Sequence, residues 1–426
     1  MERVTTLTAS LRVPTTVSRR YLAPVSFILL GVFDIVLFGF FAHAGHATFG
    51  LSISGAGVQV PDIHAPAALV CYVVGAISIA IGIWRGIAEP GRLAARLSIA
   101  GALICFLIAL LCWADAGNTT ALNVINLLQG TVVYSIPLIL GALAGVMCER
   151  SGVINIAIEG QLLLGAFAAA VITSAFSSLW LGLIAGSLAG GLLGGVLAVF
   201  AIKFLVDQIV LGVVLNVFAS GLTGYLYDRA LVPYQNRLNS PVTFSSVKIP
   251  LLGDIPIIGP VFFDSTIFLY ITYAMIALVQ VGLFRTRWGL RVRAVGEHPT
   301  AADTVGIKVL ATRYRNVIMG GLIAGIGGAF LTIGQVGSFG KDMSSGEGYI
   351  ALAAMIFGRW TPLGATAAAL LFGFSTSLQS ILATLNVPIP SNILLMAPYL
   401  VTIVAVAGLV GKVKAPKADG QPYVKA

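Results

Sequence analysis

The feature that most constrains this sequence is a series of long apolar runs separated by short polar gaps. In lipid, the polar groups of the backbone are satisfied only within helices or closed barrels. The sequence predicts an all-α, polytopic transmembrane helix bundle with about 10–12 membrane segments, because a spanning helix needs about 20 mostly apolar residues. The candidate runs are 22–42, 66–84, 97–114, 124–147, 152–175, 179–202, 208–228, 262–284, 316–338, 345–360, 362–385 and 391–411.

Two of these runs are irregular. The run at 345–360 is short for a full span, and polar residues interrupt the run at 152–175. Backbone that leaves the helical form at membrane depth is tolerated only where protein or a water-filled cavity surrounds it. We therefore expect one or two broken or re-entrant helices.

Composition excludes a soluble protein of this length. Hydrophobic residues make up 58% of the 426 residues and charged residues only 10%, whereas a soluble globular domain carries about 25% charged residues. The formal net charge of +9 would suggest nucleic acid in a soluble protein, but here the basic residues stand in short gaps between apolar runs. We expect the outer surface to contact the lipid bilayer, and no nucleic acid.

The placement of basic residues predicts the topology. If the N-terminus is cytoplasmic and every run crosses, all but four of the 25 lysines and arginines fall in gaps on the inner side. Cytoplasmic loops of membrane proteins carry such an excess of basic residues, so we expect both termini in the cytoplasm of a bacterial cell. The four exceptions are Arg229, Arg237, Lys248 and Lys341.

The first apolar run has a pattern found in secretory signals. It follows Arg19-Arg20 and precedes Ala42-His43-Ala44, which could be a cleavage site. The run is long for such a signal and contains Asp34. We therefore expect an uncleaved membrane anchor.

Two gaps are long enough to hold ordered structure. The outer gap at 229–261 contains five prolines, which fix the backbone and favour an ordered loop or short helices. The inner gap at 285–315 carries seven basic residues, and its Pro299 could open a short helix that ends near Gly306. This inner gap is too small for a domain and has the size of a docking element.

Polar residues stand inside the irregular run near 152–175. They are Asn155, Glu159 and Gln161, bracketed by Gly152 and Gly160. An ionised carboxylate in hydrocarbon costs several kcal/mol, so this segment predicts a half-helix that lines a permeation path, with Asn155 and Glu159 on one helix face. The alternative is a structural role in which Glu159 pairs across helices.

A second segment repeats this pattern later in the chain. Gly346 and Gly348 flank Glu347 before a short apolar run. Matching interrupted segments in two halves of a transporter point to an internal repeat around a central pathway. Glu347 therefore joins the pathway candidates.

Other residues predict packing rather than chemistry. Gly182, Gly186, Gly190 and Gly194 recur every four residues and form a smooth ridge on which a neighbouring helix can pack closely. The four cysteines form no C-x-x-C pair, and no metal site is predicted. The chain also lacks a G-x-x-x-x-G-K-[ST] phosphate loop, so we expect no ATP hydrolysis and no bound cofactor on this chain.

Three segments together resemble one protein family. ERSGVINIAIEGQLLLGAFAA (149–169), RAVGEHPTAADTVGIKV (293–309) and GEGYIALAAMIFGRWTPLGA (346–365) are similar to motifs of bacterial ABC-importer permeases for nucleosides and simple sugars. Ribose and branched-chain amino-acid permeases belong to the same broad group. The resemblance covers roughly 124–411.

The resemblance implies a type II ABC-importer permease fold with two permease subunits around one pathway. It also implies two cytoplasmic ABC ATPase subunits, which bind the ATP, and an extracytoplasmic substrate-binding protein. The segment 285–315 would be the cytoplasmic coupling loop. Its ATPase-coupling candidates are Arg293, Gly296, Glu297, Pro299, Ala302 and Gly306.

The predicted spans and the resemblance together divide the chain into three regions. Residues 1–115 form an N-terminal extension with about three transmembrane helices, which the resemblance does not cover. Residues 116–411 form the permease core, which contains the coupling loop, and 412–426 form a cytoplasmic tail.

The leading hypothesis is the permease subunit of an ATP-driven importer, which has no enzyme activity of its own. An autonomous carrier driven by protons or sodium, with Glu159 as coupling carboxylate, is the alternative, and a membrane enzyme is the third. Only the resemblance favours nucleosides, followed by ribose-like sugars and branched-chain amino acids. It also favours a heterodimer of two different permeases.

Overall fold

The computed structural model describes residues 18–40, 45–52, 60–88, 90–118, 121–385, 387, 393, 396 and 414–425. The chain divides into two compact units. The first unit ends at Val124, and the second begins at Ile125. The last predicted run, 391–411, lies outside the described residues except for 393 and 396.

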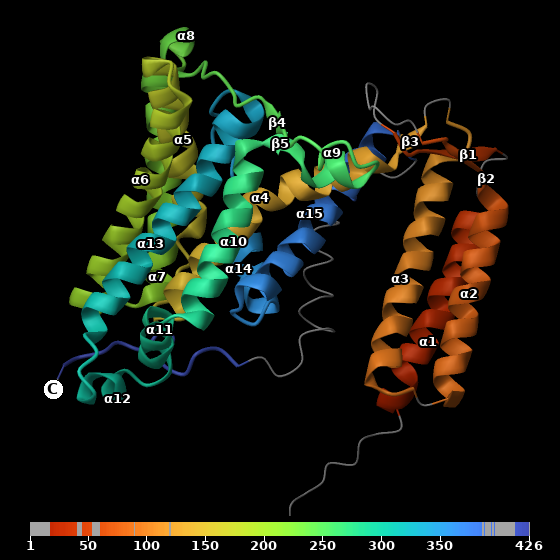
Figure 1. Ribbon diagram of the computed structural model, residues 1–426, viewed down its shortest axis with the longest axis horizontal. Coiled ribbons are helices and arrows are strands. Elements are labelled where there is room, and N and C mark those ends of the chain that lie inside the picture. The colour runs from red at the N-terminus through yellow and green to blue at the C-terminus, as the bar shows by residue number, and fades with distance from the viewer. Residues whose placement is uncertain are drawn as a thin grey trace, which may run out of the picture. The chain divides into compact units, whose positions relative to one another are not determined.

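The first unit is a bundle of three helices with a small sheet at one end (Figure 1). The strand order is β2-β1-β3, with β1 antiparallel to β2 and parallel to β3. Phe38, Cys71 and Cys112 belong to its apolar core. Its elements are α1 (Ser18–Phe33), which continues as the π-helix η1 (Asp34–Phe40), β1 (His46–Gly50), β2 (Ile63–Pro66), α2 (Ala67–Ala88), α3 (Arg92–Asp115) and β3 (Leu122–Asn123).

The second unit is a larger helix bundle in which α5, α6 and α13 pack side by side (Figure 1). Three of its long helices end in a π-helical turn. The long helices are α4 (Val124–Glu149), α5 (Ile158–Phe176), α6 (Leu179–Ala198) with η2 (Val199–Lys203), α7 (Gln208–Leu226) with η3 (Tyr227–Leu231), α10 (Ile267–Arg285), α13 (Val309–Ala329) with η4 (Phe330–Val336), and α15 (Pro362–Thr384).

Shorter elements connect these helices. The outer gap contains α8 (Gln235–Leu238), a two-stranded antiparallel sheet and α9 (Ile258–Phe262). That sheet pairs β4 (Ser246–Lys248) with β5 (Asp264–Thr266). The inner gap forms α11 (Arg287–Glu297) and α12 (Pro299–Thr304), and α14 (Glu347–Phe357) precedes α15.

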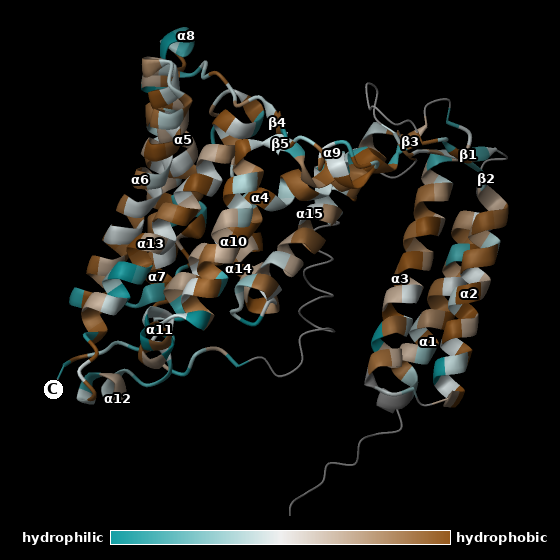
Figure 2. Cartoon of the chain, in the orientation of Figure 1, coloured by the Kyte–Doolittle hydropathy of each residue, from teal (hydrophilic) through white to brown (hydrophobic). Residues whose placement is uncertain are grey.

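The predicted fold class is confirmed, since ten described helices are long and apolar enough to cross a membrane. Apolar residues dominate along these helices (Figure 2). The five short strands and the four π-helical segments were not predicted. The strands lie in the segments that connect helices, where period-3.6 apolar patterns give no signal.

The α4 helix lies at the centre of the second unit. In the most apolar 18-residue window of each helix, 89% of the α4 residues are buried, compared with 28% of the α10 residues. A helix buried all round needs no polar face. This central position brings the chain that follows α4, from Arg150 onward, into the interior of the unit.

The irregular run at 345–360 contains the short helix α14, whose 11 residues are fewer than a full span needs. Before this run, Lys341 pairs with Asp228 near the end of α7, with 2.7 Å between Nζ and Oδ2. At the end of the run, the Trp360 carbonyl accepts a 2.8 Å hydrogen bond from Arg150, just beyond α4.

Candidate transport site

The break predicted within 152–175 lies before α5. Gly152 adopts a φ of +87°, a conformation that glycine reaches without strain, and the helix begins only at Ile158. The expectation that Asn155 and Glu159 share a helix face is therefore wrong, because Asn155 precedes the helix. The non-helical backbone is tied to α7 instead: the Ile154 N–H donates to the Gln208 side chain over 2.8 Å.

Asn155 and Gln161 pair with each other. The Asn155 amide donates to Gln161 Oε1 over 3.1 Å, and the Gln161 amide donates to Asn155 Oδ1 over 3.4 Å. Both residues are fully buried. Buried amides without such partners are costly, so this pair stabilises the break without contacting solvent in the single chain.

Glu159 caps the start of α14. Its Oε1 accepts hydrogen bonds from Ser344 Oγ at 2.6 Å and the Gly346 N–H at 2.8 Å. Its Oε2 accepts from the Gly348 N–H at 2.7 Å. The N–H groups at a helix N-terminus carry partial positive charge and favour an anion, so the carboxylate on α5 compensates the end of α14.

The backbones of α5 and α14 touch at this point. A Cβ on Gly348 would lie 2.5 Å from Glu159 Cα, closer than two carbon atoms can approach without overlap. Gly346, which precedes α14, has a φ of +86°. The two predicted interrupted segments, 155–161 and 346–348, therefore meet in space.

Asn216 of α7 joins the same cluster. Its Oδ1 accepts from the Gly160 N–H at 2.8 Å, and its amide donates to the Ile156 carbonyl at 2.9 Å and to the Tyr349 hydroxyl at 3.1 Å. This residue was not among the predicted pathway candidates. Its position as an amide in the middle of the apolar run 208–228 was the available signal.

Glu347 differs from the other three pathway candidates. It begins α14 beside Glu159, and its Oε2 atom is buried without a hydrogen-bond partner among the described residues. A buried oxygen without a partner can accept a hydrogen bond from a water or a ligand, or can bind a proton. Glu347 is thus the member of the cluster with free acceptor capacity.

The coupling candidates lie on α11 and α12, at the opposite end of the unit from α8 (Figure 1). The Arg293 guanidinium lies 5.1 Å from the centre of the Phe284 ring. A side chain at Gly296 would collide with the Arg150 carbonyl. The first contact joins α11 to α10, and the second packs α11 against the turn that precedes α5.

The α12 helix begins as the sequence predicts, with Pro299 in its first turn. Ala302 is 3% exposed and packs with Val295, Val309 and Tyr423. Gly306 ends the turn with a φ of +83°. Val305, 75% exposed, leaves an apolar side chain at the tip.

The end of the chain packs across these coupling helices. The Ala418 N–H donates to the Gly296 carbonyl over 2.9 Å, and the Lys417 N–H donates to Glu297 over 3.4 Å. Arg313 donates to the Gln421 carbonyl over 2.9 Å. Burial raises the pKa of Asp419 in this segment to about 6.

The glycines of α6 face neighbouring helices of the same chain. A Cβ at Gly182 would collide with Thr173 of α5, one at Gly186 would lie 2.8 Å from the Gly165 carbonyl, and one at Gly194 would lie 2.9 Å from the Val317 carbonyl. A Cβ at Gly190 would collide with the backbones of Gly321 and Gly325 of α13. Side-chain-free positions permit this close approach of helices.

The described part of the chain contains no group of three or more histidine, cysteine, aspartate or glutamate side chains placed to hold a metal ion. The four cysteines are buried, and none forms a disulfide.

Comparison with known proteins finds two relatives that are matched over nearly their whole lengths. The chain is 43% identical to the guanosine ABC transporter permease protein NupQ of Bacillus subtilis, over 70% of this chain and 96% of that protein. It is 42% identical to the nucleoside ABC transporter permease protein NupC of Lactococcus lactis, over 71% of this chain and 99% of that protein.

A more distant relative is the putative glucose ABC transporter permease protein TsgC13 of Haloferax volcanii, 32% identical over 63% of this chain and 80% of that protein. No solved structure matches the chain. Residues 127–410 match the family described as branched-chain amino acid transport system / permease component. The chain is a multi-pass membrane protein that belongs to this family of ABC transporter permeases.

Proposed function

We propose that this chain is the membrane permease subunit of an ATP-driven importer for nucleosides. The observation that carries the proposal is the similarity to two nucleoside permeases over nearly their whole lengths. The more distant similarity to a glucose permease leaves simple sugars as the next substrate class.

The α5–α14 junction is the proposed element of the translocation pathway. Two helices begin at one point inside the bundle, and discontinuous helices of this kind form substrate sites in many transporters. Asn155, Gln161 and Glu159 hold the junction in shape, and Glu347 is the group with acceptor capacity for water or a passing substrate.

The proposed partners follow the same assignment. Two cytoplasmic ABC ATPases would hold the ATP and dock on α11 and α12, an extracytoplasmic binding protein would deliver the substrate, and this chain would bind no cofactor. A second, different permease is favoured because B. subtilis has two guanosine permease proteins, which are 43% and 28% identical to this chain.

The proposed location is a bacterial cell membrane with both termini in the cytoplasm. The basic residues of α11 and the described tail lie at one end of the second unit, and Arg229, Arg237 and Lys341 lie near the end of α7. This asymmetry follows the positive-inside rule. Residues 1–115 remain a proposed extension, since the family match begins at 127.

Uptake measurements test the proposal. Cells with and without the gene are given labelled guanosine, ribose and leucine, before and after ATP depletion with the proton gradient clamped. We expect guanosine uptake to depend on both the gene and ATP. Gene-dependent uptake that survives ATP depletion and follows the proton gradient would instead establish a secondary transporter.

A further inference from the structure

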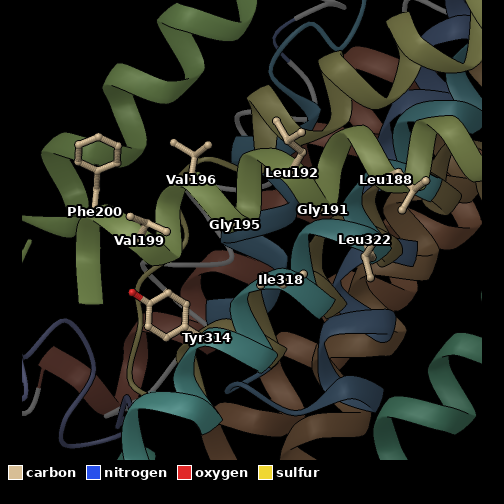
Figure 3. Close-up of a pocket in the computed structure, with 10 residues that line it drawn as sticks. All are labelled: Leu188, Gly191, Leu192, Gly195, Val196, Val199, Phe200, Tyr314, Ile318 and Leu322. Carbon is tan, nitrogen blue, oxygen red and sulfur yellow. The ribbon is translucent and has the colours of Figure 1, made fainter. Parts of the chain in front are cut away.

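An apolar groove runs along the outside of the second unit between α6 and α13. Its volume is about 750 Å³, and its walls include Leu188, Leu192, Val196, Ile318 and Leu322 (Figure 3). Gly195 of α6 leaves its floor open, because a Cβ at this position would find only Ile318 Cγ1, 3.9 Å away. Both helices are membrane spans, so the groove opens where lipid chains pack.

The groove ends at the π-helical turn η2. Val199 and Phe200 of this turn line the groove, and Tyr314 lies beside them in Figure 3. Single π-helical turns inside α-helices are frequent at functional sites. Here the turn closes the apolar part of the groove and brings Lys203 to its end.

A second, smaller pocket continues from this end. It has a volume of about 300 Å³ and shares Tyr314 with the groove. Its walls include Lys203 from the end of η2 and Lys425 from the docked tail. Both lysines are exposed, and neither forms a salt bridge with a carboxylate among the described residues.

We infer that this groove and pocket bind one anionic phospholipid. An acyl chain lies between α6 and α13, and the headgroup phosphate lies between Lys203 and Lys425. Basic pockets between transmembrane helices bind anionic headgroups in this way. The inference concerns a structural or regulatory lipid and is independent of the transported substrate.

The distribution of polarity favours a lipid over a second protein chain. The groove is apolar along its length and carries positive charge at one end only, as a phospholipid requires. The end with the lysines is the end at which α12 and the chain terminus lie (Figure 1), which we assign to the cytoplasm. The cytoplasmic leaflet of a membrane is rich in anionic lipid.

Native mass spectrometry of the full-length chain, purified with its co-expressed partners, tests the headgroup. After delipidation the complex is mixed with palmitoyl-oleoyl phosphatidylglycerol or with phosphatidylcholine of the same chains. We expect tighter retention of phosphatidylglycerol, and a loss of about fivefold in affinity for each lysine removed. The variant is Lys203→Gln with Lys425→Gln, and Lys414→Gln, on the same tail but outside the pocket, is the matched control.

A second variant tests the acyl groove. Gly195→Leu fills the groove, whereas Gly221→Leu makes the same change on α7, where a Cβ meets nothing within 4 Å. We expect only Gly195→Leu to reduce phosphatidylglycerol retention. Equal retention of both lipids by the wild type, or retention unchanged by the double lysine variant, would overturn the inference. Loss of a partner subunit from Gly195→Leu with unchanged lipid preference would assign the groove to a protein contact and overturn it too.

Discussion

Two carboxyl groups of this chain have opposite surroundings. Glu159, half-buried in the permease unit, accepts three hydrogen bonds from Ser344, Gly346 and Gly348. Asp34, in the N-terminal unit, is 0% exposed, and neither of its carboxyl oxygens has a partner among the described residues. Both stand in helices that can cross the membrane.

Glu159 is a carboxyl group with hydrogen-bond partners, whereas Asp34 is a carboxyl group without them among the described residues. A polar group that leaves water is stabilised where hydrogen bonds replace those it made to water. Glu159 therefore holds α5 and α14 together through its three hydrogen bonds, and Asp34 does not hold its bundle together in that way. If this comparison is correct, changes at the Glu159 junction cost much more than changes at Asp34.

The largest expected effect is that of Glu159→Ala. The change leaves the N–H groups of Gly346 and Gly348 without acceptors, at about 1–3 kcal/mol for each buried group. We expect a marked fall in the thermal unfolding midpoint of the purified protein and loss of guanosine uptake. Asp34→Ala is the control, and an equal fall in both variants would erase the difference between the two carboxyls.

The next effect comes from the backbone contact between α5 and α14 rather than from the hydrogen bonds of Glu159. Gly348→Ala places a methyl group against the Glu159 backbone, and overpacking of this kind costs about 1–3 kcal/mol. Gly221→Ala, in open space on α7, is its control. Thermal unfolding of the two variants side by side measures the contact, and equal stability would mean that α5 and α14 can separate there at no cost.

A smaller effect concerns a third carboxyl, Asp419, at the edge of the permease unit. Burial raises its pKa from 3.8 to about 6. A carboxyl with a raised pKa in the folded state favours folding when protonated, so its contribution is fully present below about pH 4 and is lost as the pH rises through 6. We expect the unfolding midpoint of the wild type, relative to Asp419→Asn, to fall between pH 4 and 6. A constant difference across that window would contradict the raised pKa of Asp419.

The sequence predicted the membrane spans well because apolar runs of helix length leave few alternatives. Glu159 and Glu347 were identified as candidates because charge is rare in such runs. The structure adds that the two flanking segments meet, which depends on a long-range approach at Gly348 that no local pattern encodes.

Other contacts could not be predicted from the sequence for the same reason. Asn216 bonds to Gly160 and Ile156, which lie nearly 60 positions earlier in the chain. The tail bonds to Gly296 and Arg313 through backbone groups, which carry no sequence signature. Local rules such as Pro299 opening α12 and Gly306 ending its turn succeeded because each depends on a single residue's backbone preference.

The smallest expected effect is that of Asp34→Asn, and it tests the other half of the comparison. An amide has nearly the shape of the carboxyl and cannot ionise, so if Asp34 has no partner the unfolding midpoint should change by the equivalent of at most about 1 kcal/mol. Glu159→Gln is the matched change at the engaged site, where the amide keeps one acceptor oxygen in place of two. Thermal unfolding of the two variants under one condition makes the comparison. A loss at Asp34 as large as that at Glu159 would mean that Asp34 is held as an anion by a partner outside the described residues, and the N-terminal bundle would then contain a charged site of its own.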